Sequence, residues 1–219
     1  MGEWFECVAR KIWILLRVFL LLILFSFPDI LAEKLHASQG GLLVIGILTL
    51  LLAAFYWWRA EKNTLKVWDK QFFTWKGLAI VIGGYAVCYL GGVIGHYVME
   101  LEGNSITANQ EELMAFFELV PTWFIVLTST VLPAVAEEVL IRGYILKLFF
   151  GRYQLAGLLL SSLLFALLHG PTNIGSWIVY TSPGLVLGYV YAKTDYLIYP
   201  IAIHFLNNTV ISLLYVSGF

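Results

Sequence analysis

Seven apolar runs follow one another along the chain, and each is close to the length that crosses a bilayer as a helix. A transmembrane helix needs about 20 predominantly apolar residues. The runs are continuous rather than alternating, which argues against a membrane β-barrel. The pattern therefore predicts an all-α, polytopic transmembrane bundle of about seven spans, within a range of six to eight, at residues 12–27, 41–58, 77–99, 122–149, 154–169, 173–192 and 196–218.

The composition agrees with an integral membrane protein. Hydrophobic residues occupy 60% of the 219 positions and charged residues only 12%, and the mean hydropathy of +0.84 lies far from that of soluble domains. No linker, low-complexity tract or fixed-period repeat divides the chain, so we expect a single membrane domain over residues 1–219. The lipid bilayer is thus an expected partner, and the net charge of −1 gives no reason to expect nucleic-acid binding.

Basic residues collect in alternate segments between the runs. Positively charged loops stay in the cytoplasm, so we predict a cytoplasmic N-terminus and an external C-terminus. The first run is interpreted as a retained anchor, because SFPDILAEK after it is a poor small-residue cleavage site. The opposite side holds the acidic segment 100–118 and Lys34, whereas the predicted cytoplasmic side holds Arg10, Lys11, Arg59, Lys62, Lys66, Lys70, Lys76, Lys147, Arg152 and Lys193.

Three ionisable side chains interrupt the fourth run in the stretch AVAEEVLIRGYI. An ionisable residue at membrane depth costs at least ~2.5–3.5 kcal/mol on insertion scales, so it normally has a partner or a function. Glu138 and Arg142 are spaced i, i+4 and are expected to pair on one helix face. Glu137 is rotated by about 100° from Glu138 and can point toward the bundle interior. In a simpler interpretation, the span ends before Glu137 and these charged residues lie at the membrane interface.

Two later runs carry polar residues at helical spacing. SSLLFALLHG places His169 four residues after Phe165, and PIAIHFLNNTV places His204 four residues before Asn208. Residues four apart share a helix face, so His204 and Asn208 can reach one site and the Phe165 ring can shield and orient His169. Asn207 is rotated away from His204 and ranks lower.

The remaining histidines and the cysteines show no such pattern. His36 lies in a predicted loop and His96 near the end of the third run, so both are expected to be structural or solvated. Cys7 and Cys88 lie at a span end and in mid-span, so no disulfide is expected.

The motifs EEVLIR, FALLH and HFLNN resemble the EExxxR, FxxxH and HxxxN motifs of the CAAX protease and bacteriocin-processing family of intramembrane endopeptidases, which includes the Ras-converting CAAX prenyl endopeptidase. All three occur in the order and spacing of that family. The resemblance covers about residues 122–212, which we expect to form the catalytic core, while residues 1–121 carry no motif.

The resemblance implies an endopeptidase that hydrolyses a peptide bond of a membrane-associated peptide or protein in the cell membrane of a bacterium. Glu137 and His169 would activate the attacking water. His204 and Asn208 would stabilise the oxyanion, since an amide N–H aimed at the developing charge in a site poor in water is worth a few kcal/mol. Structural support would come from Glu138, Arg142 and Phe165.

Zinc is the one cofactor that these residues could hold, with Glu137, His169 and His204 as three protein ligands. A glutamate-activated water requires no metal, and the chain has no HExxH pattern, so we favour a mechanism without a cofactor. The alternatives are an ion-coupled transporter that uses Glu137 as its proton carrier, and bacteriocin self-immunity or another non-proteolytic membrane role. The sequence carries no signal for an oligomeric state.

The expected depths of the polar residues conflict with a shared site. Counted from the predicted cytoplasmic ends at 1.5 Å per residue, His204 lies about 10 Å deep, Glu137 about 15–20 Å, and His169 near the far side. Pro133 and Pro171 flank two of these residues and are expected to break the helices and supply the adjustment.

Overall fold

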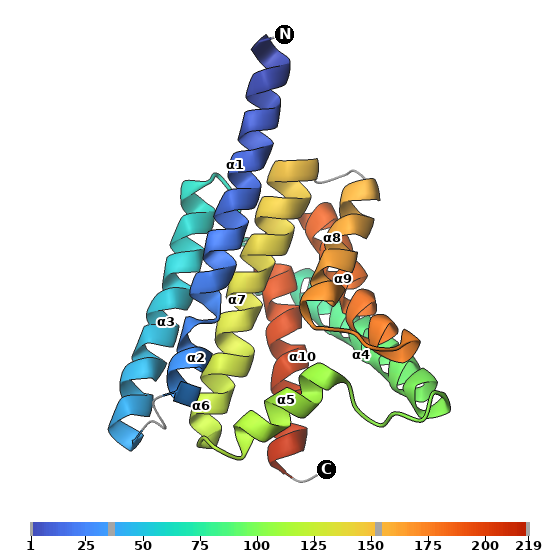
Figure 1. The fold of residues 1–219 in the computed structure, drawn as a ribbon. Coiled ribbons are helices and arrows are strands. Elements are labelled where there is room, and N and C mark those ends of the chain that lie inside the picture. Colours follow the sequence, from blue (N-terminus) through green and yellow to red (C-terminus); the bar gives the residue numbers. More distant parts are fainter. Residues whose placement is uncertain (1, 35–37, 152–154, 218–219) are drawn as a thin grey trace.

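The computed structural model describes residues 2–34, 38–151 and 155–217, and these residues form a bundle of helices without a strand (Figure 1). His36 and Arg152 lie outside the described residues. The elements in order are α1 (Gly2–Phe25), α2 (Phe27–Lys34), α3 (Gln39–Lys62), α4 (Trp75–Leu101), α5 (Ala108–Phe117), α6 (Thr122–Val126), η1 (Leu127–Val131), α7 (Leu132–Glu138), η2 (Val139–Phe150), α8 (Leu155–Leu168), α9 (Ile174–Thr194) and α10 (Ile198–Val216).

The all-α polytopic bundle predicted from the sequence is confirmed. Within the described residues, five helical stretches are long and apolar enough to cross a membrane, at Glu3–Ala32, Gln39–Lys62, Trp75–Leu101, Thr122–Phe150 and Ile198–Val216. The other two predicted spans correspond to α8 and α9, which form an antiparallel hairpin (Figure 1). With 14 residues, α8 is about 21 Å long and cannot cross the ~30 Å hydrocarbon core alone.

The stretch Thr122–Phe150 is the central element, since 72% of its apolar window is buried inside the bundle. Regular α-helical bonding is replaced by wider π-type turns in η1 and η2. Pro133 is the second residue of α7, the α-helical segment that follows η1, so the expected adjustment at this proline is seen as a change of helical pitch. Pro171 lies in the turn between α8 and α9, where Gly170 adopts a positive φ of 59°.

Helix α4 packs against α9 through glycine. A side chain at Gly95 would come within 2.8 Å of the Val179 backbone nitrogen and 2.9 Å of the Gly175 carbonyl oxygen, so only glycine permits this approach. At the end of α4, the Glu102 carboxylate accepts hydrogen bonds from the backbone N–H groups of Ile174 and Gly175, at 3.1 and 2.9 Å. These are free donors at the start of α9, so Glu102 fixes the entry of this helix.

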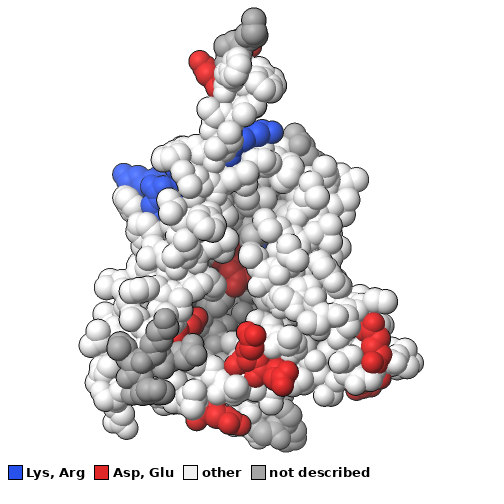
Figure 2. Space-filling view, in the orientation of Figure 1, with Lys and Arg blue, Asp and Glu red and all other residues white. Residues whose placement is uncertain are grey.

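Charge separates toward the two ends of the molecule. Figure 2 shows Lys and Arg near the end at which α1 begins, and most of the visible Asp and Glu around the other end. At the basic end, Asp195 accepts from Lys147 at 2.8 Å and pairs with Lys66 at 3.3 Å. Arg17, inside the first predicted span, donates to Asn63 at the end of α3. The two termini lie at opposite ends (Figure 1), as the predicted topology requires.

The topology can be tested with the natural thiol of Cys7, which is exposed near the start of α1. We expect a membrane-impermeant maleimide to leave Cys7 unlabelled in intact cells and to label it after lysis. In a Cys7→Ser background, Ser217→Cys at the exposed end of α10 should show the reverse, with labelling in intact cells. Labelling of both positions from the same side would contradict an odd number of crossings.

Candidate active site

A cavity of about 980 Å³ opens between the helices, and its walls are largely apolar. The face in Figure 2 is hollowed near its centre, with acidic atoms visible inside. The motif residues Glu137, Phe165, His169, His204 and Asn208 all line this cavity. The conflict of depths is resolved because α8 is short, so that His169 lies at the level of Glu137, 4.0 Å away, rather than near the far side.

The predicted pair of Glu138 and Arg142 is present and completely buried. Arg142 donates from Nη1 to Glu138 Oε1 at 2.8 Å, and both side chains have 0% exposure. The guanidinium also donates from Nη2 to the Gly184 carbonyl at 3.0 Å and lies 4.6 Å from the centre of the Phe165 ring. Arg142 therefore joins η2 to α9 and α8 by charge-assisted and cation–π contacts.

Glu138 has a second partner that the sequence did not indicate. Nδ1 of His204 lies 2.9 Å from Glu138 Oε1, and a carboxylate oxygen accepts, so Nδ1 carries the proton. The contact fixes the imidazole and leaves Nε2 as the ring nitrogen free for another partner. Glu138 is thus more than a partner for Arg142, because it also orients a predicted site residue.

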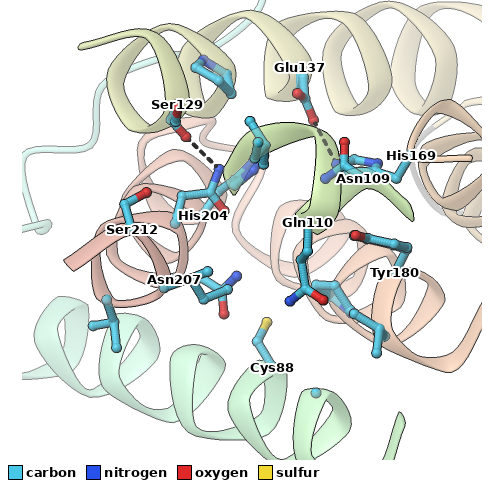
Figure 3. Close-up of a pocket in the computed structure, with 18 of the residues that line it drawn as sticks. Cys88, Asn109, Gln110, Ser129, Glu137, His169, Tyr180, His204, Asn207 and Ser212 are labelled. Atoms are coloured by element: carbon cyan, nitrogen blue, oxygen red, sulfur yellow. Dashed lines mark hydrogen bonds and ion pairs between the residues drawn. The ribbon is translucent and has the colours of Figure 1, made fainter. Parts of the chain in front are cut away.

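His169 is held on three sides. Its Nδ1 donates to the Phe165 carbonyl at 2.8 Å. Its ring stacks on Tyr180 with 4.5 Å between ring centres and a 21° tilt, and the centre of the Phe165 ring lies 4.7 Å from its own. In the neutral ring this leaves a lone pair on Nε2. That nitrogen lies 4.0 Å from Glu137 Oε2, and Figure 3 shows the two groups facing each other.

Asn208 contacts the irregular part of the central helix. Its Nδ2 donates to the carbonyl of Ser129 at 3.1 Å. Pro133, four residues after Ser129, has no N–H with which to bond that carbonyl, so the proline creates the acceptor that holds Asn208. An asparagine amide has two N–H groups, and the second stays available to the cavity.

Several cavity residues outside the motifs were missed or ranked low. His96, expected to be structural or solvated, lines the cavity and lies 3.3 Å from Nε2 of Gln110. Thr107, the N-cap of α5, is hydrogen-bonded to the hydroxyl of Tyr180, so α5 is tied to the ring that stacks on His169. No local pattern marks these residues, since their contacts join helices that are distant in sequence.

The zinc set considered from the sequence does not fit the arrangement of these side chains. Among the residues that the structure describes, no three His, Cys, Asp or Glu side chains lie together in a way that could hold a metal ion. His204 turns Nδ1 toward Glu138, while Glu137 faces His169. A tetrahedral zinc site requires three protein ligands around one point.

The fold and site define a multi-pass membrane protein with a polar site at the base of an apolar cavity. Residues 119–210 match the family described as type II CAAX prenyl endopeptidase Rce1-like. The resemblance noted from the three motifs is thus confirmed over this part of the chain.

Two curated relatives also match. The UPF0177 protein YvdC of Lactococcus lactis is 30% identical over 129 residues, which cover 58% of this chain and 49% of YvdC, so the chain spans about half the length of that relative. The protein named "Putative membrane peptidase YdiL" of Bacillus subtilis is 26% identical over 183 residues, or 81% of this chain and 72% of YdiL. No solved structure matches. These matches support a membrane peptidase at the level of the family.

The buried pair predicts a large and specific loss of stability. Arg142→Leu leaves Glu138 in the core without its cation, and breaking a buried pair in this way costs about 3–5 kcal/mol. We expect a markedly lower unfolding temperature in detergent, measured by intrinsic fluorescence. Arg142→Lys keeps the charge and should lose less. Wild-type stability of Arg142→Leu would contradict a structural role for the pair.

Proposed function

We propose that this protein is an intramembrane endopeptidase that hydrolyses a peptide bond of a membrane-associated peptide or protein. The supporting observation is the facing pair of Glu137 Oε2 and His169 Nε2 at 4.0 Å. The separation is too long for a direct hydrogen bond, and it suits a water molecule that donates one proton to each group. The lone pairs of such a water are directed into the cavity, toward a substrate carbonyl.

In the proposed reaction the water oxygen attacks the scissile carbonyl carbon while Glu137 takes one proton. The carbonyl π electrons move to oxygen and give a tetrahedral oxyanion. When this intermediate collapses, the C–N bond breaks and the proton on Glu137 passes to the leaving nitrogen, which yields a carboxylic acid and an amine. His169 holds the water throughout by accepting from it.

The oxyanion is the part of the reaction that His204 and Asn208 would stabilise. Asn208 has its second N–H for this purpose, since the first is used on Ser129. His204 donates from Nε2 when that nitrogen is protonated, with its ring held by Glu138. Fixed donors in a site poor in water are worth more than donors in bulk solvent. The proposed reaction assigns no step to a metal ion, because Glu137 and His169 between them activate the water.

The bacterial cell membrane is the proposed location, as both curated relatives are from bacteria. Hydrolysis also needs water at the site, and the cavity provides a route for it through the bundle. A transporter that carries protons on Glu137, or an immunity protein without protease activity, would not cleave peptides, so cleavage assays separate these functions from proteolysis.

The first test is cleavage of a peptide library by the purified protein in nanodiscs. Glu137→Gln removes the base, and we expect kcat to fall by roughly 10²–10⁴. Asn208→Ala removes one oxyanion donor and should cost roughly 10²–10³ in kcat. Chelator should leave the wild-type rate unchanged. Full cleavage by Glu137→Gln would sink the assignment of the base, and loss with chelator that zinc restores would replace the mechanism with a metal-dependent one.

A second test concerns the ring that stacks on His169. Tyr180→Phe keeps the stack and loses the hydroxyl contacts with Thr107 and Asn109, so we expect little change in kcat. Tyr180→Leu frees one face of the imidazole, and kcat should fall roughly ten-fold or more, since small misplacements of a catalytic group are costly. Equal rates for the two variants would show that the stack does not position His169.

A further inference from the structure

Asn207 lines the same cavity as Asn208, its neighbour on α10, and Figure 3 shows the Asn207 side chain within this cavity. Successive residues of a helix are rotated by about 100°, so the two amides serve different walls. Asn208 is occupied by the Ser129 carbonyl. Within the part of the chain that the structure describes, the Asn207 amide has no hydrogen-bond partner.

The surroundings of Asn207 indicate what could bind to its unpaired amide. Figure 3 shows Asn207 and Cys88 of α4 reaching into the space between their helices, and Tyr85, Tyr89 and Leu187 continue the same wall of the cavity. Asn207 is half-buried and its amide opens onto the cavity, so its N–H and C=O are not committed to any group of the described chain. The site is accessible from the cavity, so a ligand can supply these partners.

The chemistry of the partner follows from the amide itself. Asparagine presents a donor and an acceptor side by side, and an exposed peptide unit presents the complementary acceptor and donor. In a helical substrate these main-chain groups are already bonded to one another. Only an extended segment offers them, as in other proteins that bind peptides through main-chain hydrogen bonds.

We propose that Asn207 is a substrate-binding residue that holds the main chain of an extended substrate segment next to the scissile bond. This inference rests on the proposed endopeptidase function. The segment lies between α10 and α4, with its scissile carbonyl turned toward Glu137 and Asn208. The protein therefore acts on membrane-associated segments that can leave the helical conformation at the cleavage point, because a helix would leave Asn207 unbonded.

Two neighbouring asparagines provide a matched pair of variants. Asn207→Leu keeps the branching at Cγ and removes both hydrogen-bonding groups, so we expect KM to rise roughly ten-fold, as for the loss of one or two hydrogen bonds, with kcat nearly unchanged. Asn208→Ala should lower kcat with little effect on KM. An unchanged KM in Asn207→Leu, with an unchanged unfolding temperature, would overturn the proposal.

Binding without turnover separates this inference from the proposed function. In a Glu137→Gln background, labelled peptides with apolar centres, taken from the cleavage library, can be titrated by fluorescence anisotropy. We expect Asn207→Leu to weaken binding roughly ten-fold whether or not the wild type cleaves the peptide. Equal affinity with and without Asn207 would overturn the inference alone, and no binding to any form would overturn it together with the proposed function.

Backbone chemistry identifies the contact directly. Peptides in which one amide at a time is replaced by an ester lose a single N–H. At one position near the scissile bond, the ester should weaken binding to the Asn207 protein and have no effect on Asn207→Leu, which is the coupling that a double-mutant cycle measures. If every ester has the same effect on both proteins, Asn207 does not contact the main chain.

Discussion

The requirement that buried charge be paired shapes this molecule more than any other constraint. Arg142 and Glu138 have no access to solvent, and an isolated charge at this depth would cost several kcal/mol. The pairing is therefore obligatory, and the helices that complete it must come together. Arg142 donates to the Gly184 carbonyl in α9 and contacts the Phe165 ring in α8. Glu138 accepts from His204 of α10. Four segments converge on one ion pair.

The proposed chemistry depends on that structural centre without using its charge directly. The Glu138 carboxylate accepts from Arg142 and His204, whereas the adjacent Glu137 faces the cavity and His169. Two neighbouring glutamates thus differ because helix rotation sends them to different surroundings. Phe165 connects the buried ion pair with the proposed site, since its backbone carbonyl accepts from His169 and its ring lies over Arg142.

Irregular helices bring these groups to a common depth. Helix α8 ends at Leu168 after only 14 residues, and the chain turns at Gly170 and Pro171 before α9 begins. The central segment changes pitch around Pro133, which leaves the Ser129 carbonyl for Asn208. Regular full-length helices would have kept the polar residues at separate levels.

The sequence by itself determined the helical class, the order of the apolar segments and the positions of the polar residues within them, because hydropathy and i, i+4 spacing are local properties. It also predicted the Glu138 and Arg142 pair, which lies on one helix. Only the tertiary structure decided that His204 binds Glu138, 66 positions away, and that Asn208 binds Ser129, 79 positions away. The orientation of Asn207 and the depth of His169 were also decided only by the tertiary structure. These features depend on how helices stop, tilt and pack, and no local pattern in the chain records that.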